Sequence, residues 1–382
     1  MILPLLLACA THDLRAVRYD DTVDVAADMG PHDDAQTEWW HVHARLRDVA
    51  TGEALDLFAG FVVERTDLDR VVFVPVPMGA NPFYAAFVRL ATPERAWTAD
   101  RHSFPDFFSA GFREEGLDHF HGDWRLREEA GALVLAAGAG PARAALRMTR
   151  TRAPTLPGEG GRVRIREANH LWVQEEGLAV RGRWEEGGRV RQVEGTAFFK
   201  HQWGRLYDPG LDGFEWFSAE LPDGRALSIG WLADDGMRGV AGSLAWTATP
   251  DGVVTPIDPA DLRITSTDTW KSARSGARWP IAWTVQGAGL DLVIVAERED
   301  QEMWAFPASI WAGPTRMTGT VDGVSVAIEG FAEQVGADAP LLRALYVSDP
   351  PPGEEVAPAP VVVADPGPLV PFTLQLGAEI EE

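Results

Sequence analysis

Residues 194–224 read EGTAFFKHQWGRLYDPGLDGFEWFSAELPDG, and this stretch ends one unit of sequence and begins a second unit that looks like the first. The string EWF at 215–217, with a DG turn at 223–224, repeats EWW at 38–40 and the TG turn at 51–52. Because self-similarity within a chain is the signature of a repeated structural unit, the sequence predicts two related units.

The ends of the two units also match. A glycine pair at 187–188 precedes EGTA at 194–197, and a DG pair at 322–323 precedes EGFA at 329–332. A short linker near 205–213 holds a proline and a glycine, which are typical of loops. The predicted parts of the chain are a lipoprotein-type signal at 1–9, a polar tether at 10–31, a first β domain at 32–205, a second β domain at 212–347 and a proline-rich tail at 348–382.

Both units consist of short apolar runs that end at glycine, proline or aspartate, and a helical period of 3.6 residues is scarce. This texture predicts an antiparallel all-β fold. Segment 91–117 breaks the series with several prolines and glycines, and is predicted to be a loop that can hold a short helix. The predicted strands are 55–64, 71–76, 83–90, 132–137, 144–149, 163–173 and 178–184 in the first unit, and 214–221, 226–233, 239–248, 261–266, 281–286, 290–296, 303–311, 315–321 and 324–332 in the second, with a last one near 341–347.

Composition limits the partners of this chain. Its 382 residues include 57 acidic and 34 basic side chains, for a net charge of −23, so the protein should repel nucleic acid. Fifteen tryptophans and 17 phenylalanines indicate either large cores or a lined apolar cavity. No glycine-rich phosphate loop, G-x-S-x-G string or basic stripe is present, and we expect no cofactor.

The single cysteine, Cys9, follows an apolar run that ends in Leu-Leu-Ala. This is the shape of a bacterial lipobox, in which a peptidase cuts before the cysteine and a lipid is attached to its sulfur. The alternative is an incidental apolar start, because the run is short and has no positive residues before it. The sequence therefore favours a lipid-anchored protein of the bacterial cell envelope, on the periplasmic side or at the outer membrane. One cysteine allows no internal disulfide.

Several ordered strings together resemble one known family. They are EWW at 38–40, the G-x-A string that ends in Trp-Gly at 195–204, E-W-F-x-x-x-L-x-D-G at 215–224, the tryptophan and glycine set at 270–283, Gln-Glu at 301–302, and the closing strings at 310–313 and 330–333. Over roughly 32–347 the chain looks like the lipocalin-like family of AttH-type proteins and carotenoid 1,2-hydratases. The resemblance implies two lipocalin-like antiparallel barrels or half-barrels packed together, with an apolar ligand site at or between them. Family members add water to isoprenoid double bonds, hydrate plant phenolics or guide polyene cyclisation.

The chain departs from the hydratases at their charged centre. The hydratases have a charged triplet that resembles Asp-Arg-Glu, and this chain has Lys200, His201 and Gln202 at the same place. Two candidate acids are therefore missing. Hydration of an unactivated alkene needs a strong proton donor, usually a carboxyl group whose pKa is raised by an apolar pocket. Glu333 matches the acidic position of the family's closing strand. Glu215 remains as the acid of the second E-W string, at 215–217. A rebuilt acid/base pair at Lys200 and His201 is one interpretation, and a lysine that pairs with a carboxylate is the other.

The predicted site is an apolar cavity where the two units face each other, bordered by Trp39, Trp203, Trp216 and Trp311. Glu215 or Glu333 is the expected proton donor, His201 orients water and Lys200 stabilises a carboxylate. The function that follows is binding of a hydrophobic isoprenoid, polyene or lipid, with hydratase (hydro-lyase) activity, or binding without chemistry. The polar groups expected at the cavity are Glu38, His41, Lys200, His201, Gln202, Glu215 and Glu333.

Two H-x-H pairs support a rival hypothesis. His41 and His43 form one pair, and His119 and His121 form the other. Because strand residues alternate between faces, each pair projects both imidazoles to one side of a strand, as metal sites on barrels require. A metal-dependent enzyme would need all four histidines to converge. No other ligand lies at a spacing that ties it to them, and solvent-exposed histidines are the alternative.

Overall fold

The computed structural model describes residues 21–65, 70–71, 74–75, 82–103, 109–113, 116–165, 168–205, 213–234, 239–305 and 308–336. All of them belong to one compact unit within Met1–Val347. In these residues the regular structure is β strand, apart from one short 3-10 helix, η1 (Pro259–Asp261), so the predicted all-β class is confirmed. Cys9, the linker residues 206–212, the strand expected near 341–347 and the tail lie outside the described residues.

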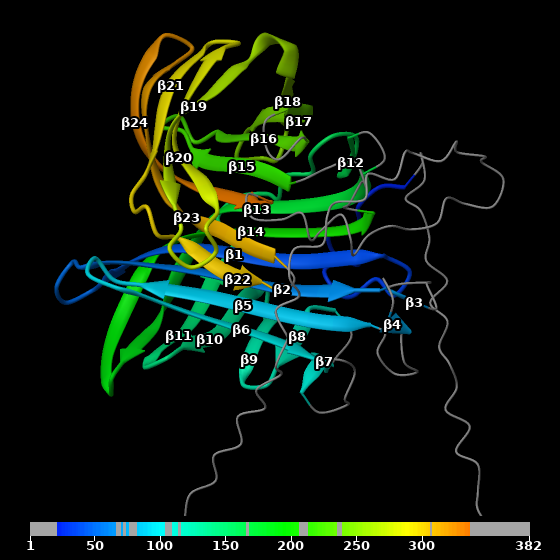
Figure 1. Cartoon of the computed structure of the whole chain (residues 1–382), viewed down its shortest axis with the longest axis vertical. Helices are drawn as coiled ribbons and strands as arrows, with labels where there is room; N and C mark the ends of the chain where they lie inside the picture. Colours follow the sequence, from blue (N-terminus) through cyan, green and yellow to red (C-terminus); the bar gives the residue numbers. More distant parts are fainter. Residues whose placement is uncertain are drawn as a thin grey trace, which may run out of the picture. The chain divides into compact units, whose positions relative to one another are not determined.

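The first sheet curls into a nearly closed lipocalin-like barrel (Figure 1). Its order is β6-β5-β2-β1-β14-β13-β11-β10-β9-β8-β7, and β12 also pairs with β13. Its strands are β1 (Thr37–Asp48), β2 (Ala54–Glu64), β5 (Phe83–Ala91), β6 (Ala96–Ser103), β7 (Ala110–Phe112), β8 (Asp118–His121), β9 (Trp124–Glu129), β10 (Ala132–Ala139), β11 (Ala142–Thr149), β12 (Arg162–Ile165), β13 (Ala168–Glu186) and β14 (Arg189–Arg205). A small separate ladder joins β3 (Arg70–Val71) to β4 (Val74–Pro75).

The second sheet is a curled half-barrel, drawn from green through orange in Figure 1. Its order is β18-β17-β16-β15-β24-β23-β21-β20-β19, and β22 also pairs with β23. Its strands are β15 (Gly213–Glu220), β16 (Ala226–Asp234), β17 (Gly239–Ala248), β18 (Val254–Ile257), β19 (Arg263–Lys271), β20 (Arg278–Gly287), β21 (Leu290–Ala296), β22 (Glu302–Ala305), β23 (Ala308–Val321) and β24 (Val324–Val335).

The two sheets place their first strands equivalently. β1 lies between β2 and β14, which are the second and the last strands of the first sheet. β15 lies between β16 and β24, which are the second and the last strands of the second sheet. The two strands that carry EWW and EWF therefore hold the same topological position, as the internal repeat predicts.

Strand alternation divides the apolar side chains between two cores and a layer between the sheets. Trp40 and Phe199 project into the core of the first sheet, and Phe217 and Trp311 project into the core of the second. The opposite faces of the same strands contact each other through two smaller apolar clusters. One cluster contains Phe58, Phe87, Met303, Ile310, Ala312 and Val335, and the other contains Val163, Trp172, Trp216, Ala226, Trp246 and Ala248.

The prediction of a loop with a short helix at 91–117 is wrong for the residues that the structure describes. β6 and β7 lie there instead, and β6 pairs along β5. β6 is at the end of the sheet order and its side chains are exposed or half-buried, so it lacks the apolar run that reveals a buried strand. Strands predicted separately at 163–173 and 178–184 instead overlap β13, where Gly177 (φ +61°) lies in a register shift of the ladder.

Candidate functional site

Ionisable side chains gather in the layer between the two sheets. On β1, Trp39, His41 and His43 share one face, as the period of two predicts, and Lys200 on β14 lies opposite His41 in the ladder. Glu333 on β24 reaches them from the second sheet. His41, His43, Lys200 and Glu333 are each at most 2% exposed.

Glu333 is the centre of this group. Nζ of Lys200 donates to its Oε2 at 2.8 Å, and Nε2 of His43 lies 3.4 Å from the same oxygen. Nδ1 of His41 lies 2.9 Å from the other oxygen, Oε1. Burial alone would raise the pKa of Glu333, but its interactions with His41, Lys200 and His43 hold that pKa well below its usual range. Glu333 is therefore an ionised carboxylate.

The two histidines of the layer are neutral at ordinary pH. Burial lowers the pKa of His41 and outweighs the opposing effect of Glu333, while Lys200 lowers it further. The pKa of His43 is lowered to about 4, again chiefly by burial. Nε2 of His41 has no hydrogen-bond partner among the described residues. A neutral imidazole with a carboxylate at Nδ1 and a vacant Nε2 has the arrangement of a general base.

Aromatic rings surround this polar centre. Phe58 and Phe87 meet the His41 ring edge to face, with centroids 5.3 and 5.7 Å away. Nζ of Lys200 lies 5.7 to 6.0 Å from the rings of Trp39, Trp172 and Phe214. Such apolar walls strengthen electrostatic interactions at the centre.

A tryptophan cluster adjoins the centre on one side. Trp172, Trp216 and Trp246 pack with centroid distances of 4.7 to 5.3 Å, and their indole N–H groups have no acceptor among the described residues. Buried indole N–H groups usually find a partner. The rings are tilted or edge-on to one another, so this cluster offers buried apolar walls together with hydrogen-bond donors.

The four predicted tryptophans do not border one cavity. Trp39 and Trp216 face the layer between the sheets, but Trp203 lies in the first core and Trp311 in the second. The correction follows from strand alternation, because Trp203 is next to Gln202, whose side chain faces the layer and accepts from the Trp39 indole. Trp311 instead donates to the carbonyl of Glu299 at 2.7 Å.

Glu215 and Glu333 have opposite ionisation states and lie on different faces of the second sheet. Nε1 of Trp283 donates to Glu215 at 2.9 Å, which places this carboxyl group in the second core. Burial raises the pKa of Glu215 to about 8, and the hydrogen bond from Trp283 offsets only part of that effect. Of the two expected proton donors, Glu215 therefore carries a proton at neutral pH and Glu333 does not.

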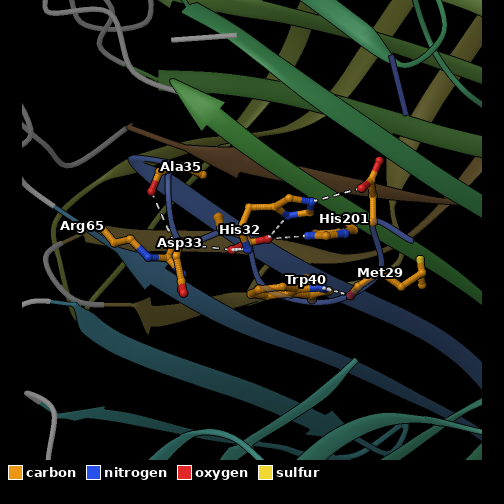
Figure 2. Close-up of polar contacts among 9 residues, drawn as sticks. Met29, His32, Asp33, Ala35, Trp40, Arg65 and His201 are labelled. Carbon is orange, nitrogen blue, oxygen red and sulfur yellow. Dashed lines mark hydrogen bonds and ion pairs between the residues drawn. The ribbon is translucent and has the colours of Figure 1, made fainter. Parts of the chain in front are cut away.

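Glu38 and His201 lie on the other face of β1 and β14, inside the first barrel. Nε2 of His201 is 2.9 Å from Oε1 of Glu38, and Nδ1 of His32 is 2.7 Å from the same oxygen (Figure 2). Burial opposes ionisation of Glu38, but the hydrogen bonds and charges of both histidines bring its pKa to about 2. His201 contacts neither Glu215 nor Glu333, so it cannot orient water for them.

The two H-x-H pairs do not form one metal site. His119 packs on Trp40 at 5.2 Å in the first core, whereas His41 lies on the opposite face of β1. The hypothesis of a site built from all four histidines is therefore wrong. Within the described residues, the metal-ligand atoms that converge belong to His32, Glu38 and His201.

Sequence reasoning missed the contribution of β13 to the layer. Trp172 lies opposite Gln202 and Gln174 lies opposite Lys200 in the ladder. The side chain of Gln174 donates to Ser228 of the second sheet at 2.8 Å. The apolar run at 163–173 predicted a strand there, but nothing in the sequence indicated that this strand is the neighbour of β14.

A family model described as AttH-like matches residues 16–336. A search of curated proteins finds no match. Solved structures show the same fold. The crystal structure of a candidate AttH from Nitrosomonas europaea is 24% identical, with a TM-score of 0.74 over 85% of this chain and 100% of that chain.

Two further structures are more distant in sequence. Kievitone hydratase from Nectria haematococca is 15% identical, with a TM-score of 0.65 over 86% of this chain and 97% of that chain. CghA is 10% identical, with a TM-score of 0.53 over the same shares.

Proposed function

Because the chain belongs to the AttH-like family, we propose that it binds an apolar unsaturated molecule in the layer between its two sheets and acts on it as a hydro-lyase. The observation that carries this proposal is the His41–Glu333 pair. A neutral imidazole, whose Nε2 has no partner among the residues that the structure describes, lies beside an ionised carboxylate, and both are buried among aromatic rings. The name of the structurally similar kievitone hydratase points to the same reaction class.

The proposed step is addition of water across a carbon–carbon double bond. Nε2 of His41 takes a proton from water as the water oxygen bonds to one alkene carbon, and the imidazolium then returns that proton to the other carbon. Glu333 holds the ring and stabilises its charged form, and Lys200 keeps Glu333 ionised. Because a base activates the water, the double bond must be polarised by conjugation to an electron-withdrawing group. An isolated alkene would instead need an acid stronger than this centre supplies.

The activity is tested by incubating the protein with enones, and with polyenes conjugated to a carbonyl group, in ¹⁸O-labelled water. Mass spectrometry should find one ¹⁸O in the product. His41→Asn should lower the rate about 10²- to 10⁴-fold, the usual contribution of general acid or base catalysis. His119→Asn is the matched control, because His119 is equally buried but lies in the first core. Equal rates for His41→Asn and the wild type would contradict the role of His41.

Binding without chemistry is the second candidate, and the tryptophan cluster favours it. The apolar rings of Trp172, Trp216 and Trp246, whose N–H groups have no acceptor in the part of the chain that the structure describes, suit a ligand that is mostly apolar and carries an oxygen acceptor. The test is incubation with a cell lipid extract followed by mass spectrometry of the bound material. Ligand quenching of tryptophan fluorescence should weaken in Trp216→Ala. Tight binding without any ¹⁸O uptake would favour this function over the lyase.

A further inference from the structure

Three side chains meet inside the first barrel, on the face of β1 opposite His41. His32 comes from the segment before β1 and His201 from β14 (Figure 2). Glu38 belongs to β1. Nδ1 of His32 and Nε2 of His201 lie 2.7 and 2.9 Å from the same oxygen, Oε1 of Glu38. All three ligand atoms lie within 4.8 Å of one another. The proposed hydro-lyase reaction makes no use of this cluster.

The Glu38 carboxylate is held with one oxygen directed at the imidazoles. Its Oε2 accepts from the backbone N–H of His32 at 3.0 Å and lies 3.4 Å from Arg65. Its Oε1 faces the two ring nitrogens. The carboxylate thus keeps one oxygen as a ligand while its other oxygen is fixed by N–H donors, an arrangement that is common around protein-bound metals.

The imidazole rings are also fixed in orientation. His32 stacks on Trp203 with centroids 4.3 Å apart and planes 4° from parallel. His201 lies between Trp40 and Trp203, 4.6 Å from each. The other nitrogen of His32, Nε2, lies 3.6 Å from a carboxylate oxygen of Asp28. An outer carboxylate of this kind usually accompanies a histidine that ligates a metal.

We propose that Nδ1 of His32, Oε1 of Glu38 and Nε2 of His201 bind a divalent transition-metal ion of the zinc type. Two imidazoles and one carboxylate favour zinc and its first-row neighbours over calcium and magnesium, which prefer oxygen ligands. Three protein ligands leave a coordination position for water or another donor.

The local charges accommodate a cation. Three carboxylates, those of Glu38, Asp33 and Asp28, lie around this site together with the guanidinium of Arg65. A divalent ion would balance the excess negative charge of these groups.

Metal binding would fasten the segment before β1 to the barrel. This segment is already attached by the Trp40 indole, which donates to the carbonyl of Met29 at 3.3 Å, and by Arg65, which donates to the carbonyl of Ala35 at 3.3 Å. A metal ion would add a link from His32 to β1 and β14. The site therefore has a structural role that can be measured as stability.

The test is a titration of the metal-stripped full chain with Co²⁺, whose visible absorption reports its coordination, and with Zn²⁺ by calorimetry. One ion per chain is expected, and excess Zn²⁺ should raise the melting temperature of the wild type. His32→Gln and His201→Gln should abolish both signals. Asp28→Asn should weaken binding about 10- to 100-fold, as loss of an outer carboxylate usually does. His102→Gln, which removes an exposed histidine, should bind normally.

Three results would overturn the proposal: no Co²⁺ absorption in the wild type, unchanged binding in His32→Gln, or loss of binding in His41→Gln instead. The partly exposed His32 makes His32→Gln the variant most certain to fold. Circular dichroism of each variant distinguishes loss of the ligand from loss of the fold. Because the measurements are metal binding and melting temperature, the result does not depend on whether the hydro-lyase activity is found.

Discussion

At the scale of single residues, Glu215 shows how one buried carboxyl group makes stability depend on pH. Its pKa is raised to about 8 in the folded chain, chiefly by burial. Between the ordinary pKa of a glutamate and pH 8 the folded state holds a proton that the unfolded state has released. Stability therefore falls as pH rises through this window, by roughly 1.4 kcal/mol per pH unit from this group.

Glu215→Gln should remove this contribution, because an amide still accepts from Trp283 but does not ionise. The free energy of unfolding, measured with urea from pH 5 to pH 9, should fall less steeply for the variant than for the wild type. Glu220→Gln, at the exposed end of the same strand, is the control and should leave the slope unchanged. Parallel pH profiles for Glu215→Gln and the wild type would show that Glu215 is ionised in the folded state.

Residue positions were predictable where local periodicity decides them. The period of two is enough to place Trp39, His41 and His43 on one face of their strand. The same rule places Trp203 and Gln202 on opposite faces of their strand. The prediction of a cavity bordered by four tryptophans did not apply this rule. The environments that set ionisation were not predictable, since whether Glu215 or Glu333 holds a proton depends on partners far away in the sequence, such as Trp283 and Lys200.

At the scale of elements, the Lys200–Glu333 pair joins β14 of one sheet to β24 of the other. Lys200→Met or Glu333→Gln alone should cost about 3–5 kcal/mol, because each leaves a buried charge without its partner. The double variant should cost less than the sum of the single variants. Urea unfolding of all four proteins gives the coupling energy, and strictly additive costs would mean that the pair does not interact.

Glycines on the second strands make room for aromatic rings in the layer. A Cβ on Gly230 of β16 would lie 2.1 Å from the Trp216 ring, and a Cβ on Gly60 of β2 would lie 2.2 Å from the Phe87 ring. Gly230→Ala should therefore cost about 1–3 kcal/mol through overpacking. The cost, measured by urea unfolding, should shrink when Trp216→Leu removes the clashing ring. An equal cost in both backgrounds would assign it to the backbone of β16.

Most of the buried strands could be predicted from apolar runs, and strands with few buried side chains could not. β2, β5 and β21 lie within a residue or two of their predicted limits. β6 was missed because it is at the end of the sheet order and has no continuous apolar side. The neighbours of each strand were not predictable either, and it is the pairing of β13 with β14 that brings Trp172 into the candidate site.

At the scale of the whole molecule, the net charge of −23 and the N-terminal cysteine concern partners rather than fold. The structure contains no helix, among the residues it describes, with the length and apolarity needed to cross a membrane. We propose lipid attachment at Cys9 as the route to the bacterial envelope. Expressed from its own start in a Gram-negative host, the chain should incorporate labelled palmitate, and Cys9→Ser should not. An unlabelled, intact Met1 would contradict the anchor.

The architecture as a whole could be predicted from the repeat, because the two copies of the E-W string mark equivalent first strands. The layer between the sheets could not be predicted from the sequence, because each side chain in it packs against side chains of the other unit. His32 illustrates this limit. It stands at the edge of a segment whose composition suggested only a tether, yet it contacts Glu38 in the first barrel.

The pairing of first with last strands has a consequence for synthesis on the ribosome. β1 cannot pair with β14 until β14 has been synthesised, so the first barrel cannot close before about residue 205 has emerged. Lys200 cannot form its ion pair until Glu333, which is 133 residues further along the chain, has also emerged. At about 5–20 residues per second this interval lasts roughly 7–27 s. During that time the nascent chain exposes a tryptophan-rich face with unpaired charges, and this face is where a chaperone would be needed.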